Sequence, residues 1–481
     1  MKILVLQLAR LGDIYMSWPA LRAIKRTYPN AEIHVMTRSR FESALDGLSV
    51  VDRRWTLPTT SIIEPLVRDE VDLVQSFNRM DGFVQELQNE KFDWIVNFTF
   101  SPFSSYLTHS LTTPNTKVTG YTRHQDGSLA LNDEVSAYFY AQVGLDGANR
   151  VHLADVFGSL IGVEYTEEDW IGPHAITEKL NLSDAFITCH IGASQDHKSL
   201  TPTQWGRLIR YVNQRHPNLK IALIGSESER NRIPEIRQAA PTAPILDFVG
   251  KTKIYELFEI LQKTELLVGG DSAPMHMASL TDTPSLNIST GNVNFWETGP
   301  KATLSFVYRQ EGLTDVHADR LGEIISSLLE GQVAPELITR TAGMVSYQIE
   351  ESPAQRFAWD LVQAIYMGGS YPLAERMETV QAAMKLTEIN NFALEQLALI
   401  PTKGIEAVTP YLDRAEEIIN TICRFAPELS PLVSWYGAEK VRIAPGSPEQ
   451  ILSATVDVHT ALRRHLSVYI PQEETPHEEV G

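Results

Sequence analysis

The sequence predicts an α/β protein with two doubly wound parallel sheets, followed by a helical extension. Over roughly the first 340 residues, short apolar runs alternate with amphipathic helical patterns, which is typical of parallel strands joined by crossover helices. A new series of strands begins near Ala185, so a second sheet with its own core is expected. Beyond about residue 345 only helical patterns continue. We therefore predict three domains, over residues 1–170, 171–344 and 345–481.

The first predicted sheet begins close to the N-terminus. Residues 3–6 form an apolar run, residues 7–12 form a turn, and a helix follows with one apolar face made of Ile14, Trp18, Leu21 and Ile24. Two more strands are predicted over residues 33–36 and 94–98. The basic residues of the first helix are expected on its polar face: Arg22, Lys25 and Arg26.

The second sheet and the extension follow the same reasoning. Four strands are expected where apolar runs end in glycine or a turn: FITCHIG, KIALIG, ILDFVG and ELLVGG. The segments between them carry helical patterns: TPTQWGRLIRYVNQRHP, SESERNRIPEIRQ and KIYELFEILQKT. In the extension, amphipathic helices are predicted over residues 374–399, 411–425 and 448–469.

Charge and cysteine content limit the class of protein. The formal net charge of −19 argues against nucleic acid as the main partner. The charge is uneven, with basic residues in excess over residues 1–54 and acidic residues in excess over residues 345–481. Because Cys189 and Cys423 are far apart, reduced thiols in a cytoplasmic protein are expected. The N-terminal apolar run is broken at Gln7, so it reads as a strand rather than a signal peptide, and no apolar stretch is long enough to span a membrane.

The segment GGDSAPMHMASL, at residues 269–280, suggests a binding site. It follows an apolar strand, and Asp271 or Ser272 can cap a helix whose first turn contains Pro274. The N-terminus of such a helix suits a phosphate or pyrophosphate, and His276 could add a hydrogen bond or a positive charge. The alternative is an ordinary capped helix with a histidine satisfied within the fold.

Further polar residues follow the carboxyl ends of the other predicted strands. These ends face one ligand-binding edge in doubly wound sheets. Lys198 is suited to a phosphate and Glu227 to the hydroxyls of a ribose, although a solvated lysine and an acid favoured by a helix dipole are the alternatives. In the first domain, Gly12 and Asp13 are expected at a helix N-terminus. Four loops of the second sheet are expected to face one cleft and to supply Ser194, Lys198, Glu227, Thr252, Ser272 and His276.

Several kinds of active site are disfavoured by missing motifs. The sequence has neither G-x-G-x-x-G nor G-x-x-x-x-G-K-[ST], which disfavours dinucleotide oxidoreductases and P-loop enzymes. It has no Asp-x-Asp pair, no H-E-x-x-H and no paired-cysteine spacing, so a dedicated metal site has little support. The motif G-x-S-x-G is also missing.

Four motifs in order resemble glycosyltransferase family 9, the bacterial heptosyltransferases of lipopolysaccharide core synthesis. They are ARLGDIYMSWPALRAIKRTYP, HIGASQDHKSLTPTQW, GSESE, and GGDSAPMHMASL with STGNVNFWETGP, and together they span roughly residues 1–340. The resemblance implies two Rossmann-like domains in a GT-B arrangement, with a glycan acceptor on the first and a nucleotide sugar, most often ADP-heptose, on the second. It also implies inversion at the anomeric carbon, no cofactor and no metal.

The resemblance assigns roles to individual residues. Asp13, in the R-x-G-D motif, would be the general base, with the capping of a helix as a compatible role. Lys198, beside Ser194, would contact the diphosphate and support catalysis. The other residues implied in donor binding are Glu227 at the ribose, Gly250 and Thr252 near the base, and Asp271, Ser272, Ala273 and His276 at the helix terminus.

The acceptor side is less defined by the resemblance. An anionic, lipid-linked acceptor would suit arginines expected in loops of the first domain: Arg40, Arg53, Arg54 and Arg123. The sequence departs from the family at Ser199 and Leu200, and in the extension beyond residue 345, whose role is not inherited. Alternatives are the same fold with another sugar or acceptor, and a non-catalytic ADP-sugar-binding protein. Brief peripheral contact with the inner face of the cytoplasmic membrane is a further hypothesis.

Overall fold

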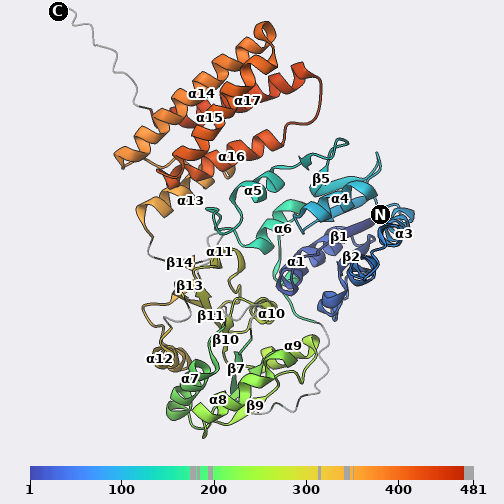
Figure 1. Cartoon of the computed structure of the whole chain (residues 1–481). Helices are drawn as coiled ribbons and strands as arrows, with labels where there is room; N and C mark the ends of the chain where they lie inside the picture. Colours follow the sequence, from blue (N-terminus) through green and yellow to red (C-terminus); the bar gives the residue numbers. More distant parts are fainter. Residues whose placement is uncertain are drawn as a thin grey trace, which may run out of the picture. The chain divides into compact units, whose positions relative to one another are not determined.

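The chain folds into two compact units. The computed structural model describes residues 1–173, 180, 182, 185–192, 199–312, 316–340, 347–349 and 351–470. The first unit contains Met1–Thr122 and Arg150–Ile349, and the second contains Arg123–Asn149 and Glu350–Gly481 (Figure 1). The helical extension therefore shares its unit with residues 123–149, which the sequence assigned to the first domain.

Five consecutive strands of the six-stranded first sheet run parallel, in the order β3, β2, β1, β4 and β5. These strands are β1 (Lys2–Leu6), β2 (Glu32–Arg38), β3 (Arg53–Leu57), β4 (Trp94–Asn97) and β5 (Lys117–Arg123). The helices that accompany this sheet are α1 (Leu11–Thr27), α3 (Leu73–Asn89), α4 (Pro102–Leu111) and α6 (Leu153–Ile161). Between β2 and α3 lie the short helices η1 (Ser39–Leu45), α2 (Thr59–Ile63) and η2 (Glu64–Leu66). The predicted strands at residues 3–6, 33–36 and 94–98 are confirmed, whereas β3 and β5 were not predicted.

The second sheet has the order β14-β13-β12-β11-β10-β7-β8-β9 and is parallel except at β13 and β14. Its strands are β7 (Phe186–His190), β8 (Lys220–Ile224), β9 (Ile245–Asp247), β10 (Leu267–Gly270), β11 (Ser285–Thr290), β12 (Ser305–Gln310), β13 (Ile338–Arg340) and β14 (Tyr347–Gln348). Its helical elements are α7 (Pro202–Arg215), η5 (Glu227–Arg232), α8 (Ile233–Ala239), η6 (Ile254–Glu256), α9 (Leu257–Lys263), α10 (Ala273–Thr281), α11 (Phe295–Thr298) and α12 (Ala318–Leu329). All four strands predicted for this sheet are confirmed.

Helix α1 joins the two sheets within the first unit. Trp18 of α1 stacks on Phe258 of α9, with ring centroids 5.5 Å apart. Arg22 is only 6% exposed and donates hydrogen bonds to the backbone carbonyls of Asp169 and Gly172, at 3.4 and 3.0 Å. The prediction that Arg22 lies on a polar helix face is therefore wrong, because the segment leading into the second sheet covers it and its guanidinium satisfies carbonyls there.

Residues 150–173 form the connection between the halves of the first unit. His152 is buried and donates from Nε2 to the carbonyl of Gly299 at 3.0 Å, while its Nδ1 accepts from the backbone N–H of Ala154. Lys301 makes an ion pair with Asp155, with an N–O distance of 2.5 Å. These contacts tie the start of α6 to the loop after α11.

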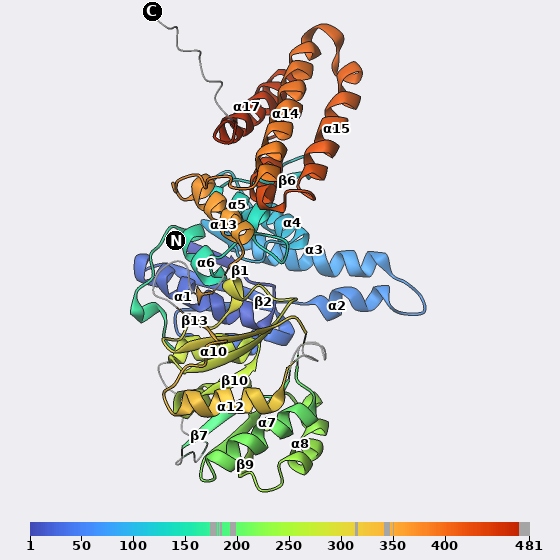
Figure 2. The same ribbon diagram turned by 90° about the vertical axis from the view of Figure 1, so that its left-hand side faces the viewer.

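The second unit is mainly helical. It contains β6 (Leu129–Leu131), α5 (Glu134–Gln142), α13 (Pro353–Tyr366), α14 (Met377–Lys403), α15 (Ile405–Ile422), η8 (Pro427–Leu429), α16 (Ser430–Val441) and α17 (Pro448–Ser467). Helices α14, α15 and α17 pack side by side in both ribbon views (Figures 1 and 2). Gln142 of α5 donates to the carbonyl of Pro431 at 2.9 Å, and the rings of Tyr138 and Tyr366 meet edge to face at 5.0 Å. The unit has its own apolar core, which includes Leu361, Leu386, Ile419, Leu432 and Leu462.

Candidate functional site

Asp13 lies in the first turn of α1, just after the carboxyl end of β1. Its Oδ2 atom accepts a hydrogen bond from the backbone N–H of Arg10 at 2.8 Å, which closes the turn. The buried Gln7 side chain supports the same turn by accepting from the N–H of Ala9 at 3.3 Å. Burial raises the pKa of Asp13, and this effect outweighs the opposing hydrogen bond and charge of Arg10. A carboxylate with a raised pKa is better matched to accepting a proton near neutral pH.

An arginine cluster, which we define as Arg10, Arg38 and Arg40, borders Asp13. Arg38 ends β2 and donates from Nε to the carbonyl of Leu8, so it is fixed to the turn before α1. Burial and the charges of Arg40 and Arg10 lower the pKa of Arg38. Within the described residues, neither Arg38 nor Arg40 forms an ion pair with a carboxylate. The cluster therefore presents positive charge at the edge where Asp13 lies.

The N-terminal cap residue of helix α10 does not use its side chain to cap the helix. Ser272 occupies the cap position, but its side chain makes no capping hydrogen bond. Its Oγ donates to the carbonyl of Gly270 at 3.1 Å and is hydrogen-bonded to Nδ1 of His190, at the end of β7, at 2.9 Å. The Ser272 hydroxyl therefore does not accept a hydrogen bond from the N–H groups in the first turn of α10, as a cap residue commonly does. This leaves the positive end of α10 suited to an anion.

His276 of α10 packs against the start of α1. A methyl group placed on Gly12 would lie 2.7 Å from Cδ2 of His276, so the glycine permits the close approach of α1 and α10. Burial lowers the pKa of His276 to about 4. This shift disfavours the option that His276 supplies a positive charge near neutral pH. Its buried Nδ1 has no hydrogen-bond partner among the described residues, so the hydrogen-bonding option stays a prediction.

Two glutamates follow β8, and they face different glycines. The carboxylate of Glu227 lies over Gly250, where an added methyl group would be 2.1 Å from Oε2. The carboxylate of Glu229 instead lies against Gly192 and closes the turn by accepting from the N–H of Ser226. The structure thus brings together Glu227 and Gly250, which the sequence expected near the ribose and the base, and Thr252 follows in the same loop.

Two other predicted donor residues cannot be described. Ser194 and Lys198 lie outside the residues that the structure describes. Asp271, Ser272, Ala273 and His276 lie together at the start of α10, as expected for that motif.

The predicted acceptor arginines do not form one group. Arg53 and Arg54 lie in β3 rather than in a loop, so that part of the prediction is wrong. Each is ion-paired with an acidic side chain: Arg53 with Glu90, and Arg54 with Asp46 at 2.7 Å. Arg123 ends β5 and donates to the carbonyl of Gly127 at 3.1 Å. Only Arg40, whose guanidinium lies 4.4 Å from the ring centroid of Phe41, belongs to the arginine cluster.

Four residues at the site were not singled out from the sequence: Arg10, Arg38, His190 and Glu229. His190 and Glu229 each stand within a predicted motif, directly before IGASQ and within GSESE. Their position within these motifs could have identified both residues as candidates for the site. Arg38 gave no such signal, because its approach to Asp13 depends on the pairing of β1 with β2.

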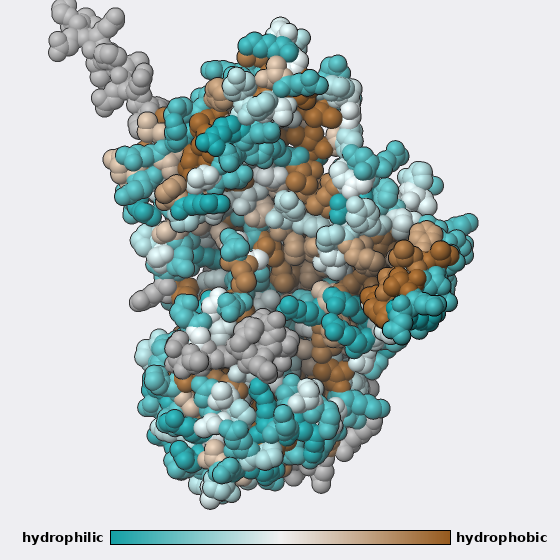
Figure 3. All heavy atoms as spheres, viewed as in Figure 1, coloured by the Kyte–Doolittle hydropathy of each residue, from teal (hydrophilic) through white to brown (hydrophobic). Residues whose placement is uncertain are grey.

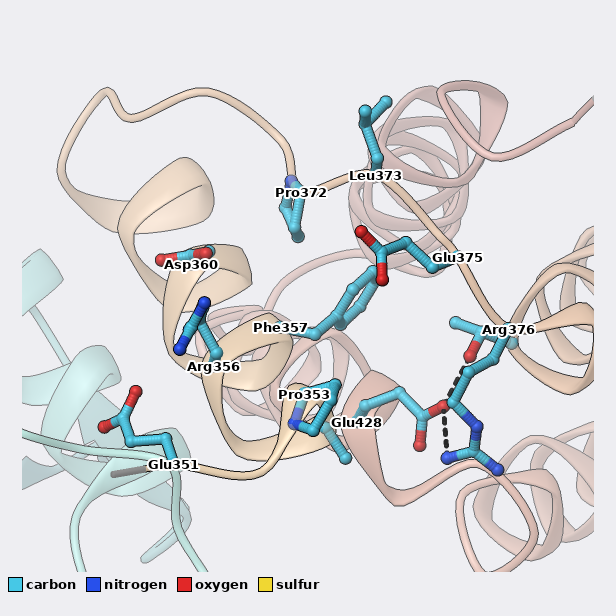
Figure 4. A pocket seen from close by; sticks show the side chains of 12 residues that line it. Glu351, Pro353, Arg356, Phe357, Asp360, Pro372, Leu373, Glu375, Arg376 and Glu428 are labelled. Carbon is cyan, nitrogen blue, oxygen red and sulfur yellow. Dashed lines mark hydrogen bonds and ion pairs between the residues drawn. The ribbon is translucent and has the colours of Figure 1, made fainter. Parts of the chain in front are cut away.

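A separate cavity of about 380 Å³ lies in the helical unit. Figure 4 shows Glu428 at its wall, accepting from Arg376 at 3.2 Å and from Thr379. Acidic, basic and aromatic side chains line the rest, including Glu351, Arg356, Phe357, Asp360 and Glu375. None of the residues predicted for donor or acceptor binding contributes to it.

The described residues contain neither a metal-binding cluster nor a helix that could span a membrane. No group of three or more histidine, cysteine, aspartate and glutamate side chains there is arranged to hold a metal ion. No helix within the same residues is both long and apolar enough to cross a membrane. Cys189 and Cys423 are both free thiols.

Comparisons with known proteins agree with the motifs. The profile of glycosyltransferase family 9 (heptosyltransferase) matches residues 80–303. Lipopolysaccharide heptosyltransferase 1 of Campylobacter coli is 24% identical over 299 residues, which cover 60% of this chain and 83% of that protein.

Solved structures support the fold. A family 9 glycosyltransferase from Veillonella parvula aligns with a TM-score of 0.52 and 16% identity, over 69% of this chain and 98% of its own. The ADP-heptose lipopolysaccharide heptosyltransferase II of E. coli aligns with a TM-score of 0.50 and 17% identity, over 69% and 99%. The predicted GT-B arrangement with a C-terminal helical region is confirmed. The chain is accordingly a heptosyltransferase-like glycosyltransferase, and it is similar to glycosyltransferase family 9 over residues 80–303.

Proposed function

We propose that the protein transfers heptose from ADP-heptose to a hydroxyl of a lipopolysaccharide core, with inversion and without a metal. One observation carries the proposal: the contact of Gly12 with His276 brings the Asp13 turn against the start of α10. A proton acceptor and a helix terminus suited to an anion are therefore neighbours. Two related proteins are described by their names as acting on lipopolysaccharide, and one of them as using ADP-heptose.

The proposed chemistry is a single displacement. The acceptor oxygen attacks the anomeric carbon as its proton passes to the Asp13 carboxylate. The bond from that carbon to the diphosphate oxygen breaks, and its electron pair leaves with ADP. The first-turn N–H groups of α10 stabilise the charge that develops on the diphosphate, together with Ser194 and Lys198. Attack from the face opposite the diphosphate gives inversion.

The remaining donor contacts follow the loops of the second sheet. Glu227 accepts the ribose hydroxyls, and residues 250–252 lie beside the base. Because Glu227 lies against Gly250, its carboxylate stands beside this loop, where it can accept such hydrogen bonds. The arginine cluster beside Asp13 would attract an anionic acceptor. The sugar-bearing lipid would be reached by peripheral contact with a membrane.

A second candidate keeps the donor and changes the acceptor. It is favoured by the inclusion of residues 123–149, from the proposed acceptor half, in the helical unit. The alignment with the Campylobacter relative covers 60% of this chain. A different surface glycan or a protein would then replace the lipopolysaccharide core.

The first test is calorimetric titration with ADP, GDP, UDP and ADP-heptose in the presence of a chelator. Selective binding of ADP and ADP-heptose is expected. Preference for another nucleotide, or binding that requires metal, would overturn the donor assignment. Transfer to purified lipopolysaccharide core and to other glycans then separates the two acceptors, and unchanged ADP binding without any transfer would favour a non-catalytic binding protein.

A further inference from the structure

An apolar ridge stands on the hairpin formed by α2 and α3. We define the ridge as Val67, Val71, Leu73, Val74 and Phe77, which are between 61% and 74% exposed. Hydrophobic side chains gather over this part of the first unit and are rimmed by hydrophilic ones (Figure 3). The exposed apolar area is roughly 500 Å², within the range of patches that mark interaction sites.

The hairpin is held together by its own polar contacts. Ser76 of α3 donates to the carbonyl of Ile62 at 2.6 Å, and Arg79 forms an ion pair with Glu64 at 2.8 Å. Asp72 caps α3 by accepting from the N–H of Gln75 at 2.8 Å. The ridge is thus presented by a preformed element, and docking would not have to fold it.

The hairpin leaves the first sheet at the edge that carries Asp13. β3 ends at Leu57, which pairs with Arg38 at the end of β2, and α2 begins at Thr59. Arg38 is in turn bonded to the turn that leads to Asp13. Figure 2 shows α2 and the start of α3 projecting beyond this sheet. The ridge and the arginine cluster therefore flank the same edge of one sheet.

Charge around the ridge identifies the kind of surface it fits. Its nearby cations, Arg68 and Arg79, are both paired with Glu64. The turn of the hairpin carries acidic residues: Asp69, Glu70 and Asp72. An anionic lipid surface would be repelled there, whereas zwitterionic headgroups would not.

Area argues against a second copy of the chain. A stable interface buries about 800 Å² on each partner, and a narrow two-helix ridge offers less. An apolar face needs to sink only about 5–10 Å into the headgroup region of a bilayer.

We propose that the α2–α3 ridge docks the protein on the zwitterionic interface of a lipid bilayer, so that a lipid-linked sugar meets Asp13 at the adjoining sheet edge. This inference rests on the proposed function for its acceptor. Docking is driven by burial of the five apolar side chains, with little help from basic residues. It should therefore be insensitive to salt.

The test uses the full chain and vesicles of phosphatidylcholine, with and without phosphatidylglycerol, at low and high salt. The variant V74D/F77D removes the ridge, and L373D/F425D is a matched control because both of its positions are exposed apolar residues of the helical unit. Wild type and control are expected to float with phosphatidylcholine vesicles at both salt concentrations. The ridge variant should lose about tenfold or more in vesicle affinity.

Three results would overturn the proposal. They are failure of the wild type to bind phosphatidylcholine, binding that needs phosphatidylglycerol and is lost at high salt, and a lipid-free dimer that V74D/F77D dissociates. The ADP titration keeps the proposed function separate, since the ridge variant should bind ADP normally. If transfer occurs, that variant should keep turnover on a delipidated acceptor and lose it on vesicle-embedded acceptor.

Discussion

Asp13 combines an observed structural role with a proposed chemical role at one carboxyl group. It closes the turn before α1 by accepting from the N–H of Arg10, and partial burial raises its pKa. Burial disfavours the charged form, so the ionised side chain is held at a cost in folding free energy. Side chains with shifted pKa values of this kind are common at active sites.

We expect Asp13→Asn to lower the rate of transfer by about 10²–10⁴-fold, which is the usual contribution of general base catalysis. In the wild type, kcat/KM should fall as the pH falls through the raised pKa of Asp13, because the protonated carboxyl cannot accept the acceptor proton. The measurement is the pH profile of initial rates, with Asp413→Asn on exposed α15 as control. Unchanged turnover in Asp13→Asn would show that another group is the base.

The same substitution should stabilise the fold. Since the pKa of Asp13 is raised on folding, the favourable contribution of the protonated form is complete below the unfolded value and is lost as pH rises through the folded value. An asparagine stays uncharged and can still accept from Arg10. Asp13→Asn should therefore raise Tm at neutral pH, with a gain that shrinks on acidification. A lower Tm at neutral pH would contradict the burial argument.

At the residue scale, the sequence named candidate site residues but did not predict the surroundings of each side chain. Motifs led to Asp13, Ser272, His276 and Glu227. They could not reveal that burial lowers the pKa of His276, because His276 packs against Gly12 of α1, which is distant in the chain. For the same reason Arg22 was assigned to a polar face, although a segment about 150 residues later in the chain covers it.

At the scale of elements, the loops after the strands decide how tightly the site is built. Gly250 has a φ of +66°, a left-handed conformation that favours glycine, and Glu227 lies directly on it. The loop after β9 and the start of η5 therefore act as one piece. Displacing either should move the carboxylate proposed to hold the ribose.

Gly250→Ala tests this coupling. The added methyl group would meet both the Glu227 carboxylate and, at 2.9 Å, its Cα atom, and the left-handed backbone adds about 1–2 kcal/mol of strain. We expect the KM for the nucleotide sugar to rise about tenfold, with a smaller change in kcat. Gly82→Ala is the matched control, because space around Gly82 in α3 is open and alanine favours the helix. Equal donor KM in both variants would contradict a role for this loop.

Strands and helices with a clear apolar pattern could be predicted from the sequence, whereas the strand β3 at the edge of its sheet could not. The runs at β7, β8, β9 and β10 stood out because these strands are apolar and end at glycine or a turn. β3 carries two arginines at its start and lies at the edge of its sheet, so its pattern resembles a loop. α13 and α16 were missed among the extension helices, whereas α14, α15 and α17 matched the predicted segments to within a few residues at most ends.

At the scale of the whole molecule, the division into units does not follow chain order. Residues 123–149 leave the first unit and pack with helices that begin at residue 353. Sequence patterns could show neither this exchange nor its partners, because the contacts join segments more than 200 residues apart. The helical unit is consequently more than a C-terminal appendage.

Removing residues 350–481 should therefore damage the remainder. The truncated chain would leave Tyr138 and Gln142 of α5 without Tyr366 and Pro431. We expect increased binding of an environment-sensitive dye, a lower Tm and aggregation, measured beside a chain ending at Ile470 that keeps every described helix. A truncated chain with wild-type Tm and no extra dye binding would show that α5 is stable without these helices.

The excursion of residues 123–149 also sets an order for synthesis of the chain. A ribosome adds about 5–20 residues per second, and about 300 residues separate the end of this segment from the end of α16, so α5 emerges roughly 15–60 s before its partner helix is complete. During that interval both sheets of the first unit can form, while the apolar side of α5 waits uncovered. The last helices made thus complete a structure begun in the first third of translation.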